Sequence, residues 1–207
     1  ETACQEIAAD YPNLQVGAIC ADFTKGLDLN HLTLESGRRL IFFPGSTIGN
    51  FQPDGARELL AGFRSAMRPG DAVLIGADRV KDPDRLVAAY DDSAGVTARF
   101  NLNLIDRINE ELDGRIDPSA LRHEAVWNAQ KARIEMHLVA IRDLHFTVSG
   151  QEFELREGES IHTENSHKFT PESFTSLAES VGFDVLHSWS DPADLFTLHW
   201  LEPADKA

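Results

Sequence analysis

The sequence is poor in basic residues, in cysteine and in long apolar runs. It has 19 lysines and arginines against 34 aspartates and glutamates, a formal net charge of −15. Nucleic-acid binding needs a basic stripe, so this charge argues against a nucleic-acid partner. No apolar run is long enough to cross a bilayer and no signal-peptide pattern is found, so we expect a cytoplasmic protein without a membrane partner. The two cysteines, Cys4 and Cys20, form neither a metal-binding spacing nor a disulfide framework.

What is present is the pattern of a globular α/β protein of 207 residues. Apolar strands are expected at residues 14–23, Leu40–Phe43 and Ala72–Asp78, with a helix from Pro53 between the last two. The near-continuous apolar run Leu40–Phe43 predicts a strand covered on both faces, as in a parallel sheet. The chain begins within a helical pattern and without Met, which suggests the later part of a longer protein.

The middle of the chain has a different pattern. Two helices with a break near Gly95 precede alternating segments that predict antiparallel strands, with turns at residues 128–131 and 149–150. Thr170 and Pro171 then suit the start of a helix, and two strands close the chain, the last inserted antiparallel. We therefore expect residues 1–80 to form an α/β core, 81–170 an inserted α+β domain, and 171–207 the return to the core.

Polar or small residues follow three of the expected strands, where open α/β sheets bind ligands. Asp22 and Phe23 suit an adenosine, because a carboxylate can accept a hydrogen bond from the exocyclic amine and an aromatic ring can stack on the base. Gly45 lets the backbone approach a bulky ligand, and Asn50 suits the carboxylate and amine of an amino acid. Asp78 ends the third strand. The alternative, a strand-end turn and an Asn-capped loop, stays open on spacing alone.

The segment "HTENSH", residues 162–167, invites a metal interpretation, but its histidines have no known zinc spacing, so no metal is expected. In a strand, His162, Glu164 and Ser166 point one way and Asn165 the other. Glu164 and Ser166 then present a carboxylate and a hydroxyl to one pocket, which suits an imidazole. A solvated polar edge strand is an equally good explanation of these residue types.

Several segments together resemble one family. "FFPGSTIGNF", "DRVKDPDRLVAAYDDSAGVTARFN", "VWNAQKARIEMHL" and "IHTENSHKF" follow one another as in the L-histidine Nα-methyltransferases of the ergothioneine pathway, and the resemblance extends over residues 1–203. It implies an enzyme that uses S-adenosylmethionine to trimethylate the α-amino group of L-histidine, giving hercynine. It also implies a Rossmann-like class I methyltransferase core with an inserted α+β substrate-binding domain, and we expect a monomer.

The resemblance assigns roles residue by residue. Asp22 and Phe23, with Gly45, match the cofactor site, and Asn50 and Tyr90 match the catalytic pair that holds the substrate's α-amino-carboxylate end. The remaining matches are to substrate-binding positions: Thr97 near the amine, Met136 lining the ring pocket, Glu164 and Ser166 as the imidazole clamp, and Asn165 between them.

The family's glycine-rich cofactor loop and a further pocket tyrosine are expected before Glu1, so this chain is expected to hold only part of the cofactor site and to leave an apolar sheet edge open. Three alternatives follow. One is a methyltransferase of the same family that acts on a tryptophan-derived substrate. The others are an amino-acid-binding module and a catalytically incompetent fragment. Glu164 with Ser166 favours histidine, because an indole has a single N–H and no use for a second polar partner.

Overall fold

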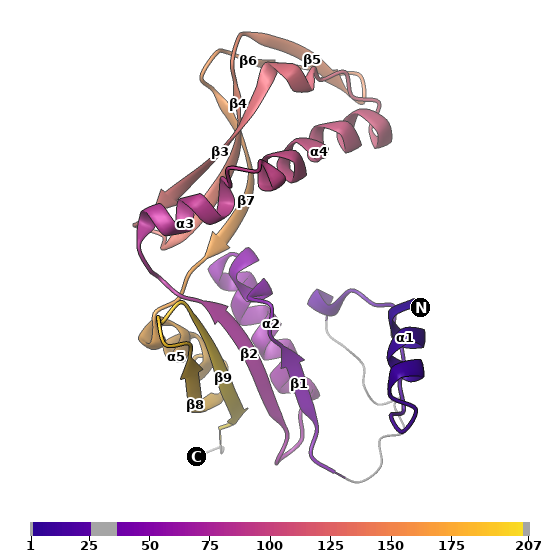
Figure 1. Cartoon of the computed structure of the whole chain (residues 1–207), viewed down its shortest axis with the longest axis vertical. Helices are drawn as coiled ribbons and strands as arrows, with labels where there is room; N and C mark the ends of the chain where they lie inside the picture. The colour runs from indigo at the N-terminus through magenta and orange to yellow at the C-terminus, as the bar shows by residue number, and fades with distance from the viewer. Residues whose placement is uncertain (1, 26–36, 205–207) are drawn as a thin grey trace.

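The structure, a computed structural model, describes residues 2–25 and 37–204 and has two parts stacked along its long axis (Figure 1). The lower part holds β1, β2, β8, β9, α2 and α5, and the upper part runs from α3 to β7. Within the described residues the elements are α1 (Thr2–Asp10), η1 (Phe23–Lys25), β1 (Leu40–Phe43), η2 (Thr47–Asn50), α2 (Pro53–Ala66), β2 (Ala72–Asp78), α3 (Pro83–Tyr90), α4 (Val96–Glu111), η3 (Pro118–Ala120), β3 (Leu121–Asn128), β4 (Arg133–Ala140), β5 (Leu144–Val148), β6 (Gln151–Leu155), β7 (Ser160–His167), α5 (Pro171–Glu179), β8 (Phe183–Ser190) and β9 (Phe196–Pro203).

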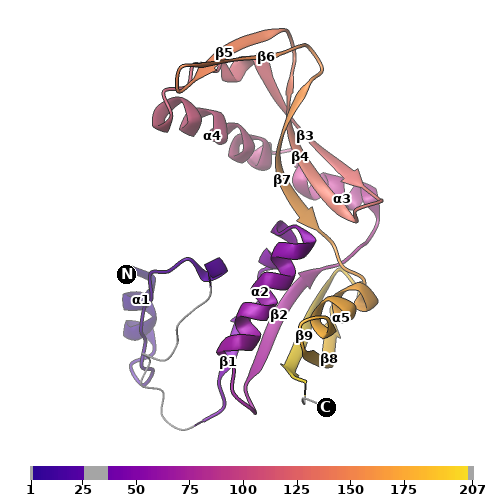
Figure 2. The ribbon, with the colours of Figure 1, turned by 180° about the vertical axis from the view of Figure 1, so that it is seen from behind.

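The lower part is built on a mixed sheet of order β1-β2-β9-β8. β1 and β2 are parallel and joined through α2, whereas β9 pairs antiparallel with β2, so the expected βαβ unit and reversed last strand are both confirmed. Helices α2 and α5 cover the same face of this sheet (Figure 2). The core between them is made of fully buried apolar side chains that include Leu60, Val73, Phe174 and Leu201.

Local sequence signals explain both helices. α2 begins with Pro53, whose missing N–H is not needed at a helix start, and it turns Leu59, Leu60 and Phe63 toward the sheet. α5 begins at a capping box, in which Thr170 and Ser173 each bond the other's backbone N–H. The expected N-cap is therefore confirmed, and such a cap stabilises a helix by about 1 kcal/mol.

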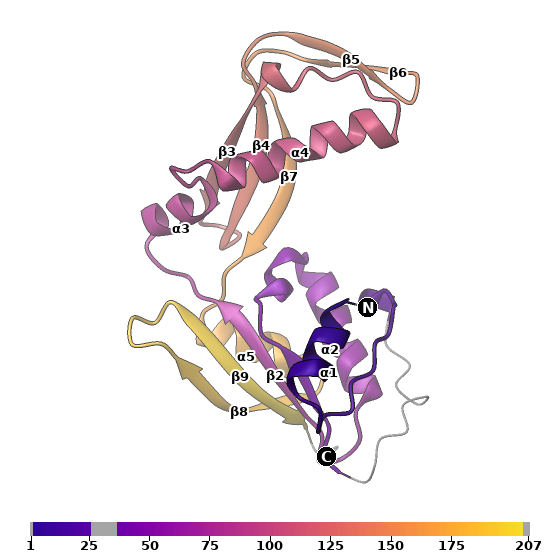
Figure 3. The ribbon, with the colours of Figure 1, turned by 45° about the vertical axis from the view of Figure 1, so that its right-hand side comes forward.

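The upper part is an antiparallel sheet of order β3-β4-β7 with a separate β5–β6 hairpin. Helix α4 lies across one face of this sheet (Figure 3). The expected break between α3 and α4 is confirmed at Gly95, whose φ of 66° lies in the left-handed region that favours glycine. The expected turns fall between β3 and β4 and at residues 149–150 between β5 and β6. None of the helices in the described ranges has the length and apolar character needed to span a membrane.

Two strand predictions are wrong. Residues 14–23 form no strand, because no strand of the described residues lies beside them to take up their backbone hydrogen bonds, and their side chains are exposed. β1 forms as expected but is not covered on both faces: Leu40 is 49% exposed and Phe42 is 63% exposed. β1 lies at the edge of the described sheet and packs only its other face, through Ile41 and Phe43, against the core.

Candidate functional site

The candidate site lies where the two parts of the molecule join. The chain rises from β2 through residues 79–82 and returns from β7 through residues 168–170, and these two segments run side by side (Figure 1). The Phe169 N–H donates to the Asp78 carbonyl at 2.9 Å, and the Val80 N–H donates to the Phe169 carbonyl at 3.1 Å. We call residues 78–81 together with 168–169 the neck. Its paired backbones fix the end of β2 against the end of β7.

The loop after β1, residues 44–50, packs against the neck. Ser46 adopts a left-handed φ of 54°, and its Oγ accepts a hydrogen bond from the Asp78 N–H at 2.9 Å. A Cβ on Gly49 would lie only 2.6 Å from the His167 carbonyl oxygen, so this close approach requires glycine. His167 Nδ1–H donates to the Gly49 carbonyl at 3.0 Å. These contacts hold the exposed Asn50, the last residue of η2, beside the end of β7.

A fully buried lysine connects the neck to the upper part. Lys168 has a side chain that is 0% exposed, and its Nζ lies 2.8 Å from each of three oxygens: Tyr90 Oη, Ser166 Oγ and Asp78 Oδ2. Tyr90 Oη and Ser166 Oγ are themselves 2.7 Å apart. Burial alone would raise the pKa of Asp78, but hydrogen bonds from Lys168 and Lys81 outweigh it and hold that pKa below its usual range.

Tyr90 is also fixed through its backbone. His123 Nε2–H donates to the Tyr90 carbonyl at 2.8 Å, and His123 Nδ1 accepts from the Asn101 amide at 2.9 Å. The Asn101 amide donates in addition to the His137 carbonyl at 3.2 Å, and Asn101 is buried. Side chains from α4 and β3 therefore hold the end of α3, and with it the phenol of Tyr90, in place.

The face of β4 and β7 that points to α3 and α4 carries the expected ring pocket. Met136 is buried in a cluster with Leu86 and Ile134, against which Tyr90 packs. Glu164 is the cross-strand neighbour of Met136. Burial raises the pKa of Glu164, and no cation or hydrogen bond from the described residues offsets this effect. Glu164 faces a cleft of about 190 Å³ that is also lined by Phe100, Asn101, Asn103, Leu104, Arg107 and Thr163.

His162 does not share this face, so the prediction that it points with Glu164 and Ser166 is wrong. Met136 pairs with Glu164, but the next residue of β4, His137, pairs with His162, so Thr163 is an extra residue in β7. Such a bulge interrupts the alternation of side chains along a strand. The residues before Thr163 therefore face the opposite side from the one that simple alternation predicts.

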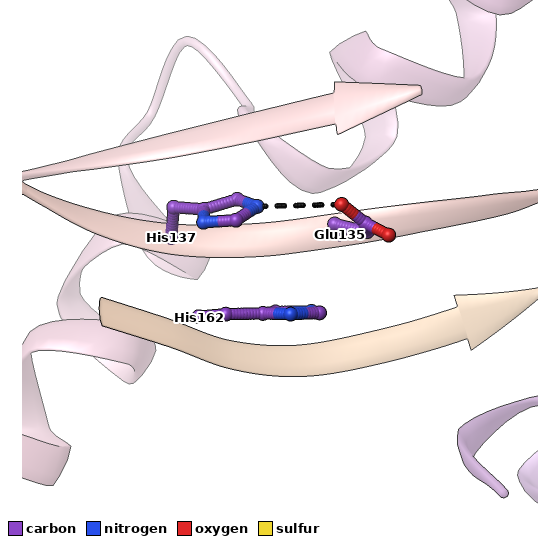
Figure 4. Close-up of side chains that lie close together, drawn as sticks. All are labelled: Glu135, His137 and His162. Atoms are coloured by element: carbon purple, nitrogen blue, oxygen red, sulfur yellow. Dashed lines mark ion pairs between the residues drawn. The ribbon is translucent and has the colours of Figure 1, made fainter. Parts of the chain in front are cut away.

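On that opposite face, His162 stacks on His137 and both lie near Glu135 (Figure 4). The two ring centroids are 4.7 Å apart with an angle of 21° between the planes. Glu135 Oε1 accepts from Arg133 Nε at 2.7 Å and from Asn128 Nδ2 at 3.0 Å, and Oε2 lies 3.6 Å from His137 Nε2. Nearly parallel stacked rings direct their lone pairs along parallel planes and not to one point. The trio as placed is therefore a carboxylate, already bonded to Arg133 and Asn128, beside a ring stack.

Two further expected substrate residues take no part in the hydrogen bonds that Tyr90 and Ser166 make among the described residues. Asn165 pairs across the strands with Glu135, on the opposite face from Glu164, and its Oδ1 is buried without a hydrogen-bond partner among the described residues. Thr97 lies in the first turn of α4, where its N–H donates to Asp92 Oδ1 at 2.8 Å. Hydrogen bonds from the Thr97 and Val96 backbone lower the pKa of Asp92 to about 2.

Comparison with known proteins identifies the family. Residues 1–203 match the family model described as a histidine-specific, SAM-dependent methyltransferase. The chain belongs to this family. It is 43% identical over 195 residues to a histidine N-alpha-methyltransferase of Mycolicibacterium smegmatis and 40% identical over 201 residues to one of Mycobacterium tuberculosis, covering 93% of this chain in each case. Ergothioneine biosynthesis protein 1 of Neurospora crassa is 30% identical over 161 residues, which are 74% of this chain and 17% of its own length. This chain spans 60% of the length of each of the first two relatives.

The expected α/β fold of this methyltransferase family, with an inserted α+β part, is confirmed by the lower mixed sheet and the upper antiparallel sheet. The residues expected at the family's cofactor also fit an adenosine. Thr24 donates two hydrogen bonds to the Asp22 carboxylate, which lower its pKa, so it stays an ionised acceptor for an amine. Phe23 packs edge-to-face on Phe43 with centroids 5.9 Å apart and remains 38% exposed, so it keeps surface for a base. A Cβ on Gly45 would meet only Thr47 Oγ1 within 4 Å, at 3.7 Å, so this backbone is open to a bulky ligand.

Three residues of this candidate site were missed as site residues. Lys168 follows Ser166 by two positions in the quoted "NSHKF", so strand alternation alone would place both on one face. Asp78 was noticed only as a strand end, and its pairing with Lys168 depends on the neck. His123 carried no sequence signal, because its partners Tyr90 and Asn101 come from two different helices.

Proposed function

We propose that this chain is the part of an S-adenosylmethionine-dependent N-methyltransferase that holds L-histidine, the enzyme trimethylating its α-amino group to hercynine as the first step of ergothioneine biosynthesis. Family membership and the 43% and 40% identity to histidine N-alpha-methyltransferases support the reaction. The similarity to ergothioneine biosynthesis protein 1 supports the pathway. In this proposal residues 81–170 are the substrate-binding domain, and residues 1–80 and 171–207 belong to the methyltransferase core.

The observation that carries the proposal is the state of Glu164. Its carboxylate is half-buried on the same sheet face as Ser166 and Met136, with a pKa raised by burial. A carboxylate that loses water without gaining a donor is destabilised by about 1–3 kcal/mol, and a ligand N–H removes that penalty. A histidine ring supplies such an N–H and, two atoms away, a lone pair for the hydroxyls of Ser166 or Tyr90.

The reaction needs alignment more than it needs a reactive side chain. S-adenosylmethionine supplies a methyl group on a sulfonium, and the substrate must present an uncharged amine in line with it. We propose that Asn50 and Tyr90 hold the α-amino-carboxylate end while Glu164 and Ser166 hold the ring, with Thr97 and Asn165 farther from the ring. Alignment of this kind contributes up to about 7–11 kcal/mol in well-oriented systems.

The adenosine end of the cofactor would be held by Asp22, Phe23 and Gly45. Asp22 is ionised, Phe23 is partly exposed, and the backbone at Gly45 is open. We further propose a cytoplasmic monomer that takes small molecules only. The net charge of −15 supports the absence of a nucleic-acid partner, because phosphates would be repelled. A methyltransferase acting on small metabolites needs no membrane.

The test is a methylation assay on the protein expressed from its natural gene, with any residues encoded before Glu1. It is incubated with S-adenosylmethionine and either histidine or tryptophan, and the products are identified by mass spectrometry. We expect mono-, di- and trimethylated histidine and no methylated tryptophan. Methylated tryptophan alone would favour the tryptophan-directed relatives. Histidine binding without any product would favour an amino-acid-binding module and contradict the proposal.

A further inference from the structure

The buried Lys168 has no spare donor. An ammonium group carries three N–H donors and no acceptor. Its three oxygen neighbours, on Tyr90, Ser166 and Asp78, all lie at 2.8 Å and use all three donors. Asp78 is held in turn by Lys81, whose Nζ lies 2.5 Å from the other carboxylate oxygen. Both hydroxyls of the site therefore accept from one immobile cation.

This arrangement fixes what the two hydroxyls offer to a ligand. Tyr90 Oη and Ser166 Oγ lie 2.7 Å apart, so one hydroxyl proton lies between them. Each hydroxyl carries a single proton, and each oxygen already accepts from Lys168. One O–H and one lone pair are then left over, and the lone pair lies beside the Lys168 ammonium, which disfavours an approaching cationic N–H. The Tyr90–Ser166 pair faces the ligand as a hydrogen-bond donor, whichever of the two hydroxyls carries the free proton.

We propose that Lys168, anchored by Asp78, is a positioning residue that makes the Tyr90–Ser166 pair a fixed donor and so selects the uncharged imidazole ring of the substrate. The ring then directs its lone pair to this pair and its N–H to Glu164. The inference rests on the proposed function, because it takes histidine as the ligand. It goes further in naming the protonation state that is bound and the residue that selects it.

The spacing along β7 suits this geometry. Glu164 and Ser166 are two residues apart on one strand face, which places them about 7 Å apart. An imidazole with one hydrogen bond at each nitrogen spans about the same length. Glu164 has no competing partner among the described residues, whereas Ser166 is held by Lys168 and Tyr90. The ring therefore meets an acceptor at one end and a donor at the other.

Charge opposes the other forms of the ring. An imidazolium has two N–H groups and no lone pair, so one N–H would face a donor backed by the Lys168 ammonium. Glu164 alone would favour the imidazolium, and Lys168 is the group that reverses this preference. An indole has one N–H and no lone pair, so it would leave the fixed donor without an acceptor, which is costly in a buried site.

The other charged groups around the pair come from each neighbouring element. Lys81 and Asp78 lie at the end of β2, and Arg107 lines the Glu164 cleft from α4. His167 follows Ser166 in β7, and its pKa is lowered by burial and by the charges of Arg133 and Lys168. The pKa values of His167 and Asp78 also depend on Lys168, so each protein is compared with its own triazole series, which these two groups affect alike. A difference between the two proteins therefore reports Lys168.

The test is calorimetric titration of the full protein with S-adenosylhomocysteine present, between pH 5.0 and 8.0. Two ligands are compared: histidine and 1,2,4-triazol-3-yl-alanine, whose ring has an N–H and a lone pair but stays uncharged over this range. For wild type we expect histidine to bind about 30-fold more weakly at pH 5.0 than at pH 8.0, relative to the triazole, because an imidazole with a pKa of about 6.5 becomes protonated. Dividing the histidine affinity by the triazole affinity at each pH removes the effects of Glu164 and His167 titration, because these groups act on both ligands.

In Lys168→Met the hydroxyls are free to accept from an imidazolium. We therefore expect the loss of histidine affinity between pH 8.0 and pH 5.0, relative to the triazole, to shrink to about 5-fold or less. Lys131→Met, at an exposed position between β3 and β4, is the matched control and keeps the wild-type ratio. If Lys168→Met does not fold, the charge-balanced pair Lys168→Met with Asp78→Asn replaces it, with folding checked by circular dichroism.

A wild-type protein whose relative histidine affinity does not fall in acid overturns the inference, as does a folded Lys168 variant with the wild-type ratio. Either result with normal histidine methylation leaves the proposed function intact. Absence of histidine binding at pH 8.0 contradicts the proposed function instead. A rise of the Michaelis constant in Lys168→Met with unchanged pH dependence indicates a purely structural lysine.

Discussion

Glu135 and Glu164 lie on neighbouring strands of one sheet, on its two faces, and their chemical situations are opposite. Glu135 accepts from Arg133 and Asn128; burial alone would raise its pKa, but these partners outweigh burial and lower it. Glu164 is half-buried, lacks a donor among the described residues, and has a raised pKa. Two carboxylates on paired strands thus differ in whether the fold itself satisfies them.

The difference separates a structural cluster from a binding site. A saturated carboxylate stabilises the fold and has little capacity left for a ligand. An unpartnered one weakens the free protein slightly and gains a partner when the right ligand arrives. The same contrast explains why the histidines beside Glu135, although chemically conspicuous, are less informative than the single carboxylate beside Met136. Substitutions on the two faces should therefore affect different measurements.

The largest expected effect is on stability, from Glu135→Ala. Arg133 and Glu135 have side chains only 6% and 15% exposed, so removing the carboxylate leaves a buried guanidinium without its charged partner and with only the Gln52 amide oxygen as an acceptor. We expect a loss of about 3–5 kcal/mol in the free energy of unfolding, measured by urea denaturation. Glu135→Gln, which keeps one acceptor, is the control and should lose less. A loss below about 1 kcal/mol in the alanine variant would show that Glu135 is not the saturated partner inferred here.

Glu164→Ala should have the next largest effect, on binding. We expect histidine affinity to fall about 10- to 100-fold, while S-adenosylhomocysteine affinity changes less than about 2-fold. The free energy of unfolding should stay the same or rise, because an unsatisfied carboxylate is removed. Calorimetric titration of both ligands measures the first two quantities, with Glu135→Gln as the opposite-face control. Equal losses for the two ligands would contradict the assignment of Glu164 to the ring.

The sequence predicts most of the fold because most elements carry their own signals. Gly95 ends one helical pattern and starts another, and Thr170 with Pro171 begins α5 through contacts a few residues apart. The strand prediction for residues 14–23 was wrong because an apolar run forms a strand only when a neighbouring strand is there to pair with it. The predicted orientation of His162 was wrong for a similar reason, since the bulge at Thr163 is a property of the β4–β7 pairing and not of either strand alone.

The site was predictable in residue type but not in connection. Glu164, Ser166 and Met136 were expected to share a ring pocket, and the structure brings them onto one face. Tyr90 was expected at the α-amino-carboxylate end of the substrate, and the structure brings its hydroxyl within 2.7 Å of Ser166 Oγ. Tyr90 and Ser166 contact each other directly, and both contact Lys168. These contacts join the end of α3 to the end of β7, and Tyr90 and Lys168 are 78 positions apart in sequence. Alternation along a strand predicts which face of the sheet a side chain occupies, whereas the residues it contacts on that face depend on tertiary structure.

The pH dependence of stability sharpens the comparison and should be a smaller effect. The pKa of Glu164 is raised in the folded state, so its stabilising contribution is present below the usual value of 4.5 and is lost as pH rises through the folded pKa. The lowered pKa of Glu135 gives the opposite sign: its contribution is present above 4.5 and is lost as pH falls through the folded pKa. Urea unfolding between pH 3.5 and 7, of wild type, Glu164→Gln and Glu135→Gln, should therefore give difference curves of opposite slope. Curves of the same slope would mean that the two carboxylates are not in opposite states.

The smallest expected effect is that of His162→Ala, and it tests which face His162 occupies. The ring is exposed and stacks on His137, so its removal should change the free energy of unfolding by about 0.5 kcal/mol or less. Histidine affinity should change less than 2-fold, because the bulge at Thr163 turns His162 away from Glu164. The measurement is the same calorimetric titration used for Glu164→Ala. A loss approaching that of Glu164→Ala would place His162 in the ring pocket and contradict the strand register on which the comparison of the two faces depends.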